Sequence, residues 1–159
     1  MTLDGSGIVL ASNSASRKAM LEAAGIAFTA RGADIDERAL ENEMDGAEPA
    51  EIAQALAAAK AAAVSSALPD DLVLGSDSLV EVDGRRFDKP ASRADAADHL
   101  RAFSGKVMTL HSAAALARGS QIMWIGSDFA RLRVRELSAA FIEAYLDAEW
   151  PAVSYCVGV

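Results

Sequence analysis

The stretch Leu72-Val73-Leu74-Gly75-Ser76-Asp77-Ser78-Leu79-Val80 places one carboxylate between two apolar runs. Leu72 to Leu74 is typical of a short buried strand, and the glycine and serine after it are typical of a turn. In α/β folds, residues that contact ligands lie just beyond the carboxyl ends of such strands. We therefore expect Asp77 in a loop after a strand, where its carboxylate can hold a metal ion or accept a proton. The alternative is a turn residue that hydrogen-bonds its own backbone.

On both sides of this stretch, apolar runs alternate with segments of helical spacing. We expect strands over residues 8–11, 26–30, 72–74, 80–82, 86–87, 107–116, 122–125 and 129–134, with a further strand starting in 153–157. Helices are expected over the segment that ends at Gly25 and over residues 49–68, 92–103 and 138–146. Such alternation predicts an α/β or mixed α+β sheet protein.

Length and composition fit one domain, or two small lobes that share one core. The 159 residues are 52% hydrophobic and 24% charged, with a formal net charge of −8. An acidic chain lacks the broad basic face that nucleic acids need, so no nucleic-acid partner is expected. The sequence contains no apolar run of about 20 residues and no signal-peptide pattern, so we expect no membrane partner and a cytoplasmic location.

Cysteine and histidine are scarce in this chain. Cys156 is the single cysteine, and His99 and His111 are the two histidines. A cysteine-based metal cluster and an internal disulfide are excluded, and a Ser-His-Asp triad is not expected. Any metal should therefore be a hard cation held by carboxylates.

One group of carboxylates, Asp34, Asp36 and Glu37, follows the expected strand at 26–30. Mg²⁺ sites are built from one or two such carboxylates together with substrate phosphates. The alternative for this acidic segment is solvated surface.

Cations occur in three of the candidate segments. The first segment is Ser12-Asn13-Ser14-Ala15-Ser16-Arg17-Lys18, which follows an expected strand and begins an expected helix. Its hydroxyl groups and two cations lie at the helix start, where free N–H groups and the helix dipole favour phosphate binding. Lys60 lies in a four-residue repeat with Leu56 and Val64, which indicates an inward-facing cation in an alanine-rich helix. Lys89 precedes Pro90, which favours an extended backbone in a loop. The alternatives are a capping Ser14 with a solvated Arg17, and a Lys60 that reaches solvent along its stem.

Taken together, five segments resemble the Maf family of nucleoside triphosphate pyrophosphatases in order and spacing: 10–17, 34–37, 60–61, 75–78 and 89–90. The likeness extends from about Ile8 to Gly158. It implies one domain over residues 1–159, with two lobes around a central cleft and a mixed sheet flanked by helices, similar to inosine triphosphate pyrophosphatases. It also implies a homodimer and hydrolysis of a nucleoside triphosphate to the monophosphate and pyrophosphate.

The resemblance also implies roles for particular residues. Asp77 would be the proton acceptor, and Glu37 and Asp77 would hold Mg²⁺ or Mn²⁺ between carboxylates and phosphates. The residues that would lie against the triphosphate are Ser12, Ser14, Arg17, Lys60 and Lys89. In the same family, a nucleotide-binding regulator of cell division and septum formation is the alternative function.

Three positions that select the base depart from the family pattern. Ser16 stands where a branch that acts on dTTP and UTP has arginine and a branch that acts on 7-methyl-GTP has tryptophan. Ser78 replaces threonine or glutamine, and Gly158 replaces glutamine or glutamate. The expected substrate is thus a noncanonical, modified or pyrimidine nucleotide, 7-methyl-GTP among them, with the base left open. By the same resemblance, Val159 precedes the last hairpin and helix of such proteins.

Overall fold

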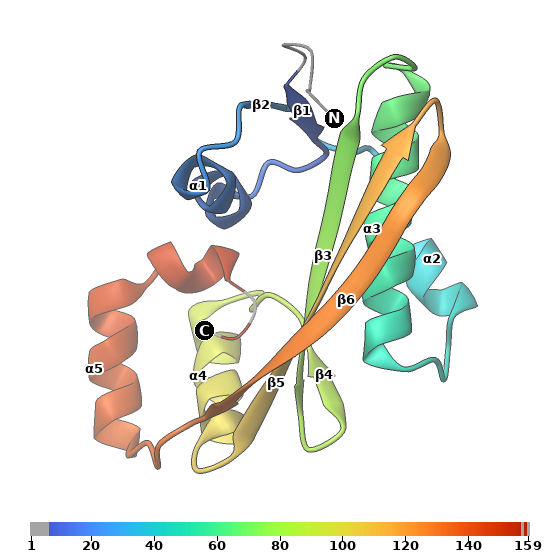
Figure 1. Cartoon of the computed structure of the whole chain (residues 1–159). Helices are drawn as coiled ribbons and strands as arrows, with labels where there is room; N and C mark the ends of the chain where they lie inside the picture. The colour runs from blue at the N-terminus through green and yellow to red at the C-terminus, as the bar shows by residue number, and fades with distance from the viewer. Residues whose placement is uncertain (1–6, 157, 159) are drawn as a thin grey trace. The chain divides into compact units, whose positions relative to one another are not determined.

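The structure, a computed structural model, describes residues 7–156 and 158. These residues form two compact units. The first consists of residues 7–77 and 112–128, and the second of residues 78–111, 129–156 and 158. The strands are β1 (Ile8–Leu10), β2 (Phe28–Ala30), β3 (Val73–Val82), β4 (Arg85–Phe87), β5 (Val107–Arg118) and β6 (Gln121–Arg133). The helices are α1 (Ala15–Ala23), α2 (Glu37–Glu43), α3 (Pro49–Ser66), α4 (Arg93–Phe103) and α5 (Ala139–Glu149), followed by the 3₁₀ turn η1 (Ala152–Tyr155) (Figure 1).

The strands form one mixed sheet in the order β2-β1-β3-β5-β6, with β4 paired to β3. β1 runs parallel to both β2 and β3, with Val9 opposite Val73, whereas β4 is antiparallel to β3, with Phe87 opposite Val80. The predicted mixed α/β class is therefore confirmed. None of the helices in the described part of the chain combines the length and apolar character of a membrane span.

In the first unit, α3 packs against β3 at very short range. Ala57 and Ala61 of α3 are fully buried, and a Cβ added at Gly75 of β3 would lie 2.1 Å from the Ala57 carbonyl oxygen and 2.7 Å from the Ala61 nitrogen. Side chains larger than these alanines and this glycine would hold the helix and strand apart. The composition of α3 and the glycine in β3 thus set the distance between the two elements.

The second unit has two apolar clusters of its own. One joins β3, β4 and α4 through Val80, Phe87 and Phe103. The other joins α4 to α5 through residues that include Leu100 and Leu146. Helix α4 is therefore the element that both clusters share.

Strand β3 corrects the prediction that a turn begins at Gly75. Residues 73–82 are one strand, and its buried positions are odd-numbered from Val73 to Leu79 and even-numbered at Val80 and Val82. The buried face of the strand thus changes between Leu79 and Val80. The predicted loop location of Asp77 is wrong, because Asp77 is a buried residue within β3.

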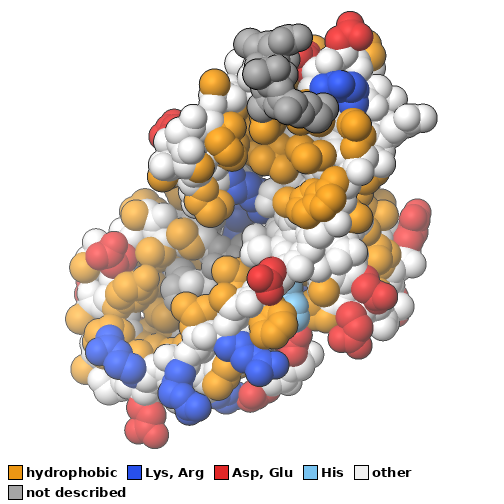
Figure 2. All heavy atoms as spheres, in the orientation of Figure 1, with side chains coloured by type: hydrophobic (Ala, Val, Ile, Leu, Met, Phe, Trp, Pro, Cys, Tyr) orange, Lys and Arg blue, Asp and Glu red, His pale blue; other side chains and the backbone are white. Residues whose placement is uncertain are grey.

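Strand β6 corrects a second predicted break, between residues 125 and 129. A Cβ at Gly126 would lie 2.6 Å from the Trp124 ring, so this glycine makes room for the indole inside a continuous strand. Hydrophobic side chains are visible at the surface in Figure 2, and several of the largest exposed ones belong to β6: Ile122, Met123, Trp124, Ile125, Phe129 and Leu132. These residues lie on β6, the strand at one end of the sheet order.

The strand expected to start in 153–157 is also wrong. Residues 152–155 form η1, and Val153 packs against the cluster of α4 and α5. Val157 lies outside the described residues. The apolar character of this segment is explained by packing against helices, without a strand.

The close approach at Gly75 gives a stability prediction. Gly75→Ala should lower the free energy of unfolding by about 3 kcal/mol, because the new methyl group meets backbone atoms that cannot rotate away. Ser76→Ala is the matched control, since it changes the neighbouring strand residue without adding a heavy atom. Chemical denaturation monitored by circular dichroism measures both variants, and equal stability of the two would contradict the packing described.

Candidate functional site

Lys60 is a buried cation held by two carboxylates from different elements. The residue is 8% exposed in α3, and its Nζ donates a 2.6 Å hydrogen bond to Asp77 Oδ1 of β3. The same Nζ lies 3.1 Å from Glu37 Oε1, at the first residue of α2. The inward orientation expected for Lys60 is therefore confirmed. All three residues belong to the first unit.

The close approach at Gly75 accounts for this contact. Gly75 and Asp77 are two residues apart on one strand and so point to the same side of β3, while Lys60 lies in sequence between Ala57 and Ala61, the helix residues whose backbone atoms are closest to Gly75. A short helix-to-strand distance at Gly75 therefore brings the Lys60 ammonium within hydrogen-bond range of Asp77.

Asp77 is 6% exposed, and its surroundings act on its carboxyl group in opposite directions. Burial is the largest influence and raises the pKa of Asp77 above its ordinary value of 3.8. The hydrogen bond and charge of Lys60, and the charge of Arg17, lower this pKa, whereas the charge of Glu37 raises it. The net pKa is raised, as is common for a carboxylate that exchanges protons in a catalytic site.

The first turn of α1 lies beside Ser12, which is also buried. Ser12 Oγ accepts hydrogen bonds from the Ser14 backbone N–H at 3.1 Å and from Arg17 Nη1 at 3.2 Å. Ser14 is the N-cap residue, but its side chain makes no capping bond and its Oγ lies 2.9 Å from Ser16 Oγ instead. The alternative, in which the Ser14 side chain caps this helix, is therefore not supported. Because no side chain caps this helix start, its N–H groups are available to an anion.

The acidic segment divides into residues with different roles. Asp36 is the N-cap of α2 and accepts a 2.9 Å hydrogen bond from the Ala39 N–H, so its carboxylate has a structural role. Glu37 begins the same helix and turns to Lys60, with its side chain 49% exposed. Asp34 is exposed. Of the three predicted carboxylates, the structure brings Glu37 to the Lys60–Asp77 pair.

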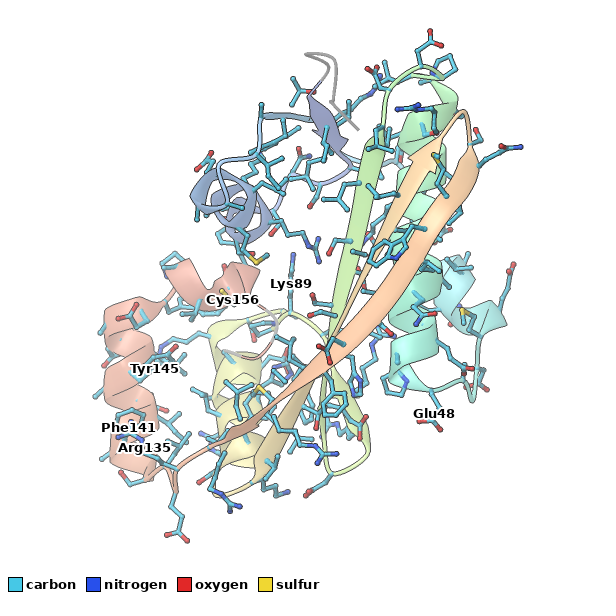
Figure 3. All side chains as sticks on the ribbon, in the orientation of Figure 1. Glu48, Lys89, Arg135, Phe141, Tyr145 and Cys156 are labelled. Atoms are coloured by element: carbon cyan, nitrogen blue, oxygen red, sulfur yellow. The ribbon has the colours of Figure 1, made fainter. Side chains whose placement is uncertain are left out.

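Lys89 and the three positions linked to base selection are distributed over both units. Lys89 is exposed in the second unit, on the loop between β4 and α4 (Figure 3). Gly158 is also in the second unit, with a φ of +75° that favours glycine, near Met108 and Val80. Ser16 is exposed on α1, and Ser78 is partly buried next to Asp77. The roles of these residues in binding therefore stay predictions.

Sequence reasoning missed helix α2 and the positioning role of Gly75. Asp36 followed by Ala39 and Leu40 is a helix-start signal that could have revealed α2. An isolated glycine between apolar strand residues is likewise a known sign of a close backbone approach, and it was interpreted as a turn.

The fit of a divalent cation can be tested on the donor atoms present. In residues 7–156 and 158, no group of three or more Asp, Glu, His or Cys side chains is arranged to hold a metal ion. Glu37 and Asp77 each place a carboxylate oxygen beside the Lys60 ammonium. Such oxygens suit the hard ion Mg²⁺ where substrate phosphates complete its ligands. The residues thus fit a cation shared with a substrate and do not form an all-protein cage.

Comparison with known proteins gives relatives along nearly the whole chain. A nucleoside triphosphate pyrophosphatase from Nitrobacter winogradskyi is 44% identical over 151 residues, covering 95% of this chain and 75% of that protein. A 7-methyl-GTP pyrophosphatase from Rhizobium meliloti is 45% identical over 141 residues, covering 87% of this chain and 71% of that protein.

Solved structures agree with the fold at low sequence identity. A HAM1 protein from Coxiella burnetii has a TM-score of 0.50 and 19% identity, with 79% of this chain and 71% of that chain covered. The Staphylococcus aureus Ham1 protein has a TM-score of 0.52 and 17% identity, with coverage of 79% and 70%. The family model described as Maf-like protein matches residues 7–158, and with these relatives it shows that the chain belongs to the Maf-like protein family.

Proposed function

We propose that this protein hydrolyses a nucleoside triphosphate to the nucleoside monophosphate and pyrophosphate. The observation that carries the proposal is the buried Lys60 ammonium between the carboxylates of Asp77 and Glu37, with Arg17 near enough to act on the Asp77 pKa. Cations that offset phosphate charge and a carboxylate that accepts a proton are the two requirements of this reaction. The names of the two curated relatives support the same reaction class.

The phosphates of the substrate are assigned to the cations and to the start of α1. Arg17 and the uncapped N–H groups of α1 favour negative charge at the same helix end, where Ser12 and Ser14 add hydroxyl donors. Lys60 can exchange one carboxylate partner for a phosphate oxygen, since Glu37 and Asp77 both hold it now. Lys89 supplies a further ammonium for the polyphosphate.

Asp77 is assigned as the general base. Its carboxylate accepts a proton from water as the water oxygen forms a bond to the α-phosphorus, and the bond to the bridging oxygen of pyrophosphate breaks. The cations offset the charge that grows on the departing pyrophosphate. A Mg²⁺ or Mn²⁺ ion, held by Glu37 and Asp77 with the phosphates, would supply further charge neutralisation when bound.

The base is proposed to be modified, noncanonical or pyrimidine, since Ser16, Ser78 and Gly158 match no single branch of the family. One experiment tests reaction and base together: incubation with Mg²⁺ and a panel that includes 7-methyl-GTP, UTP, dTTP and ITP. We expect equal amounts of pyrophosphate and monophosphate from at least one of them. Release of orthophosphate would place the cleavage elsewhere, and binding without release would favour the regulator of cell division.

Replacing the proposed base should remove turnover while the fold is kept. Asp77→Asn is expected to lower kcat by about 10²- to 10⁴-fold, because an amide cannot accept the proton. Asp70→Asn makes the same chemical change at an exposed residue of the first unit and should leave kcat unaltered. Pyrophosphate release measures both, with circular dichroism as the check on folding. Near-normal turnover by Asp77→Asn would refute its assignment as the base.

The pH dependence follows from the direction of the Asp77 shift. The base must be ionised, so kcat/KM should fall as the pH drops through a pKa that lies above 3.8. Lys60→Met removes the hydrogen bond and the charge that lower this pKa, so the acidic limb of the profile should move to higher pH. Profiles of kcat/KM for the two proteins measure the shift, and a limb that stays in place or moves to lower pH contradicts the assignment.

Metal binding should depend on the nucleotide. Because two carboxylates are too few for a tight site and the Lys60 ammonium lies between them, Mn²⁺ alone should bind weakly, with a Kd of about a millimolar or above. A nonhydrolysable triphosphate should make Mn²⁺ binding to the protein at least tenfold tighter. Electron paramagnetic resonance of free Mn²⁺ measures both affinities, after subtraction of the Mn²⁺ that the triphosphate holds in a protein-free sample. Tight binding without nucleotide would show a preformed metal cage.

A further inference from the structure

The loop that carries Lys89 is anchored at its beginning by aromatic packing. It connects Phe87, the last residue of β4, to α4. The Phe87 ring is buried and lies 5.1 Å from the His99 ring and 4.8 Å from the Phe103 ring, centroid to centroid, in edge-to-face geometry. Because both partner rings belong to α4, the start of the loop is fixed on the helix that follows it.

The end of the loop is anchored by a hydrogen bond from Asp95. The Ala91 N–H donates to Asp95 Oδ2 at 2.8 Å, and Asp95 Oδ1 lies 3.6 Å from His99 Nε2. Pro90 is buried between these points, whereas Lys89 is exposed. In Figure 3, Lys89 projects from its loop away from α4. A carboxylate in the first turn of α4 thus reaches back to the backbone two residues after Lys89.

This bond is separate from the capping of α4. The helix is capped by Ser92, whose Oγ accepts a 3.1 Å hydrogen bond from the Asp95 N–H. The backbone N–H of Asp95 therefore takes part in the cap of α4, whereas its side chain holds the loop. The two contributions can be removed independently, one at Ser92 and the other at the Asp95 carboxylate.

We propose that Asp95 is a positioning residue for Lys89, fixing the direction in which the loop presents the lysine to the polyphosphate. Pro90 confines Lys89 to extended backbone and fixes its own φ. Between Lys89 and Ala91, the backbone dihedral angles that can still vary most are therefore Pro90 ψ and Ala91 φ. The Ala91–Asp95 bond removes that freedom. The inference rests on the proposed function, because Lys89 is assigned there to the phosphates.

The rate of such a reaction depends on how accurately the groups that orient the substrate are placed. A misplacement of about 1 Å in a group that orients a substrate can cost about 10²-fold in rate. Asp95→Ala should therefore lower kcat/KM for pyrophosphate release by about ten- to a hundredfold. Asp95→Asn keeps an acceptor oxygen for the Ala91 N–H and should retain most of the wild-type value.

A double-mutant cycle with Lys89→Met tests whether Asp95 acts through the lysine. Lys89→Met should lower kcat/KM, and Asp95→Ala should then add no further loss in that background, because no lysine is left to position. Ser92→Ala is the matched control, since it weakens the α4 cap but leaves the Ala91–Asp95 bond; its kcat/KM should stay within about twofold of wild type.

Hydrogen exchange at the Ala91 amide, followed by NMR, supplies a readout that does not need activity. The amide should exchange at least tenfold faster in Asp95→Ala than in wild type or Asp95→Asn. Unchanged exchange, or a full additional loss of kcat/KM in the Lys89→Met background, would overturn the positioning role alone. A Lys89→Met variant with wild-type kcat/KM would overturn the assignment of Lys89 to the phosphates and the inference with it. If the wild type releases no pyrophosphate from any triphosphate, the proposed function fails while the Ala91 exchange still tests the anchor.

Discussion

The burial of the Lys60 ammonium is the constraint on which the first unit depends. Taking a charge out of water costs several kcal/mol, so the ammonium requires the carboxylates of Asp77 and Glu37 beside it. This requirement joins α2, α3 and β3 at a single nitrogen atom. Apolar residues of similar size often replace such a buried pair without loss of stability, so stability alone does not explain its presence. The proposed role of these residues in phosphate binding and proton transfer would account for it.

The packing of small residues makes this charged group geometrically possible. At Gly75 the strand backbone touches the backbone of α3, with no side chain between them except alanine methyl groups. Two flexible side chains, a lysine and an aspartate, would otherwise have to span a wider gap and would lose more conformational entropy on being fixed. The distance between Lys60 and Asp77 is thus set by a backbone contact between α3 and β3, two residues before Asp77 on the strand.

The sequence predicts which elements carry Lys60 and Asp77 better than it predicts the boundaries of the strands. Four-residue spacing correctly places Lys60 inside α3, and the apolar runs locate the strand that carries Asp77. Gly75, however, is interpreted as part of a turn, because a glycine needed for close packing looks the same in sequence as one needed for a bend. Helix α2 was missed because its capping residue Asp36 was grouped with two other acids, although its local pattern fits a helix start. The role of Glu37, in contrast, becomes visible only through its contact with Lys60, which is distant in sequence.

The sign of the charges around Lys60 also bears on the choice between enzyme and regulator. A module that only bound a triphosphate would gain affinity from cations and from the start of α1, and would lose affinity from carboxylates nearby, because like charges repel in a poorly solvated site. Here Asp77 is buried, and Glu37 also faces Lys60, while the net pKa of Asp77 is raised. Retaining these carboxylates next to the proposed phosphate cations is costly for binding and useful for proton transfer or for a cation shared with the substrate. The arrangement therefore favours a protein that turns its nucleotide over.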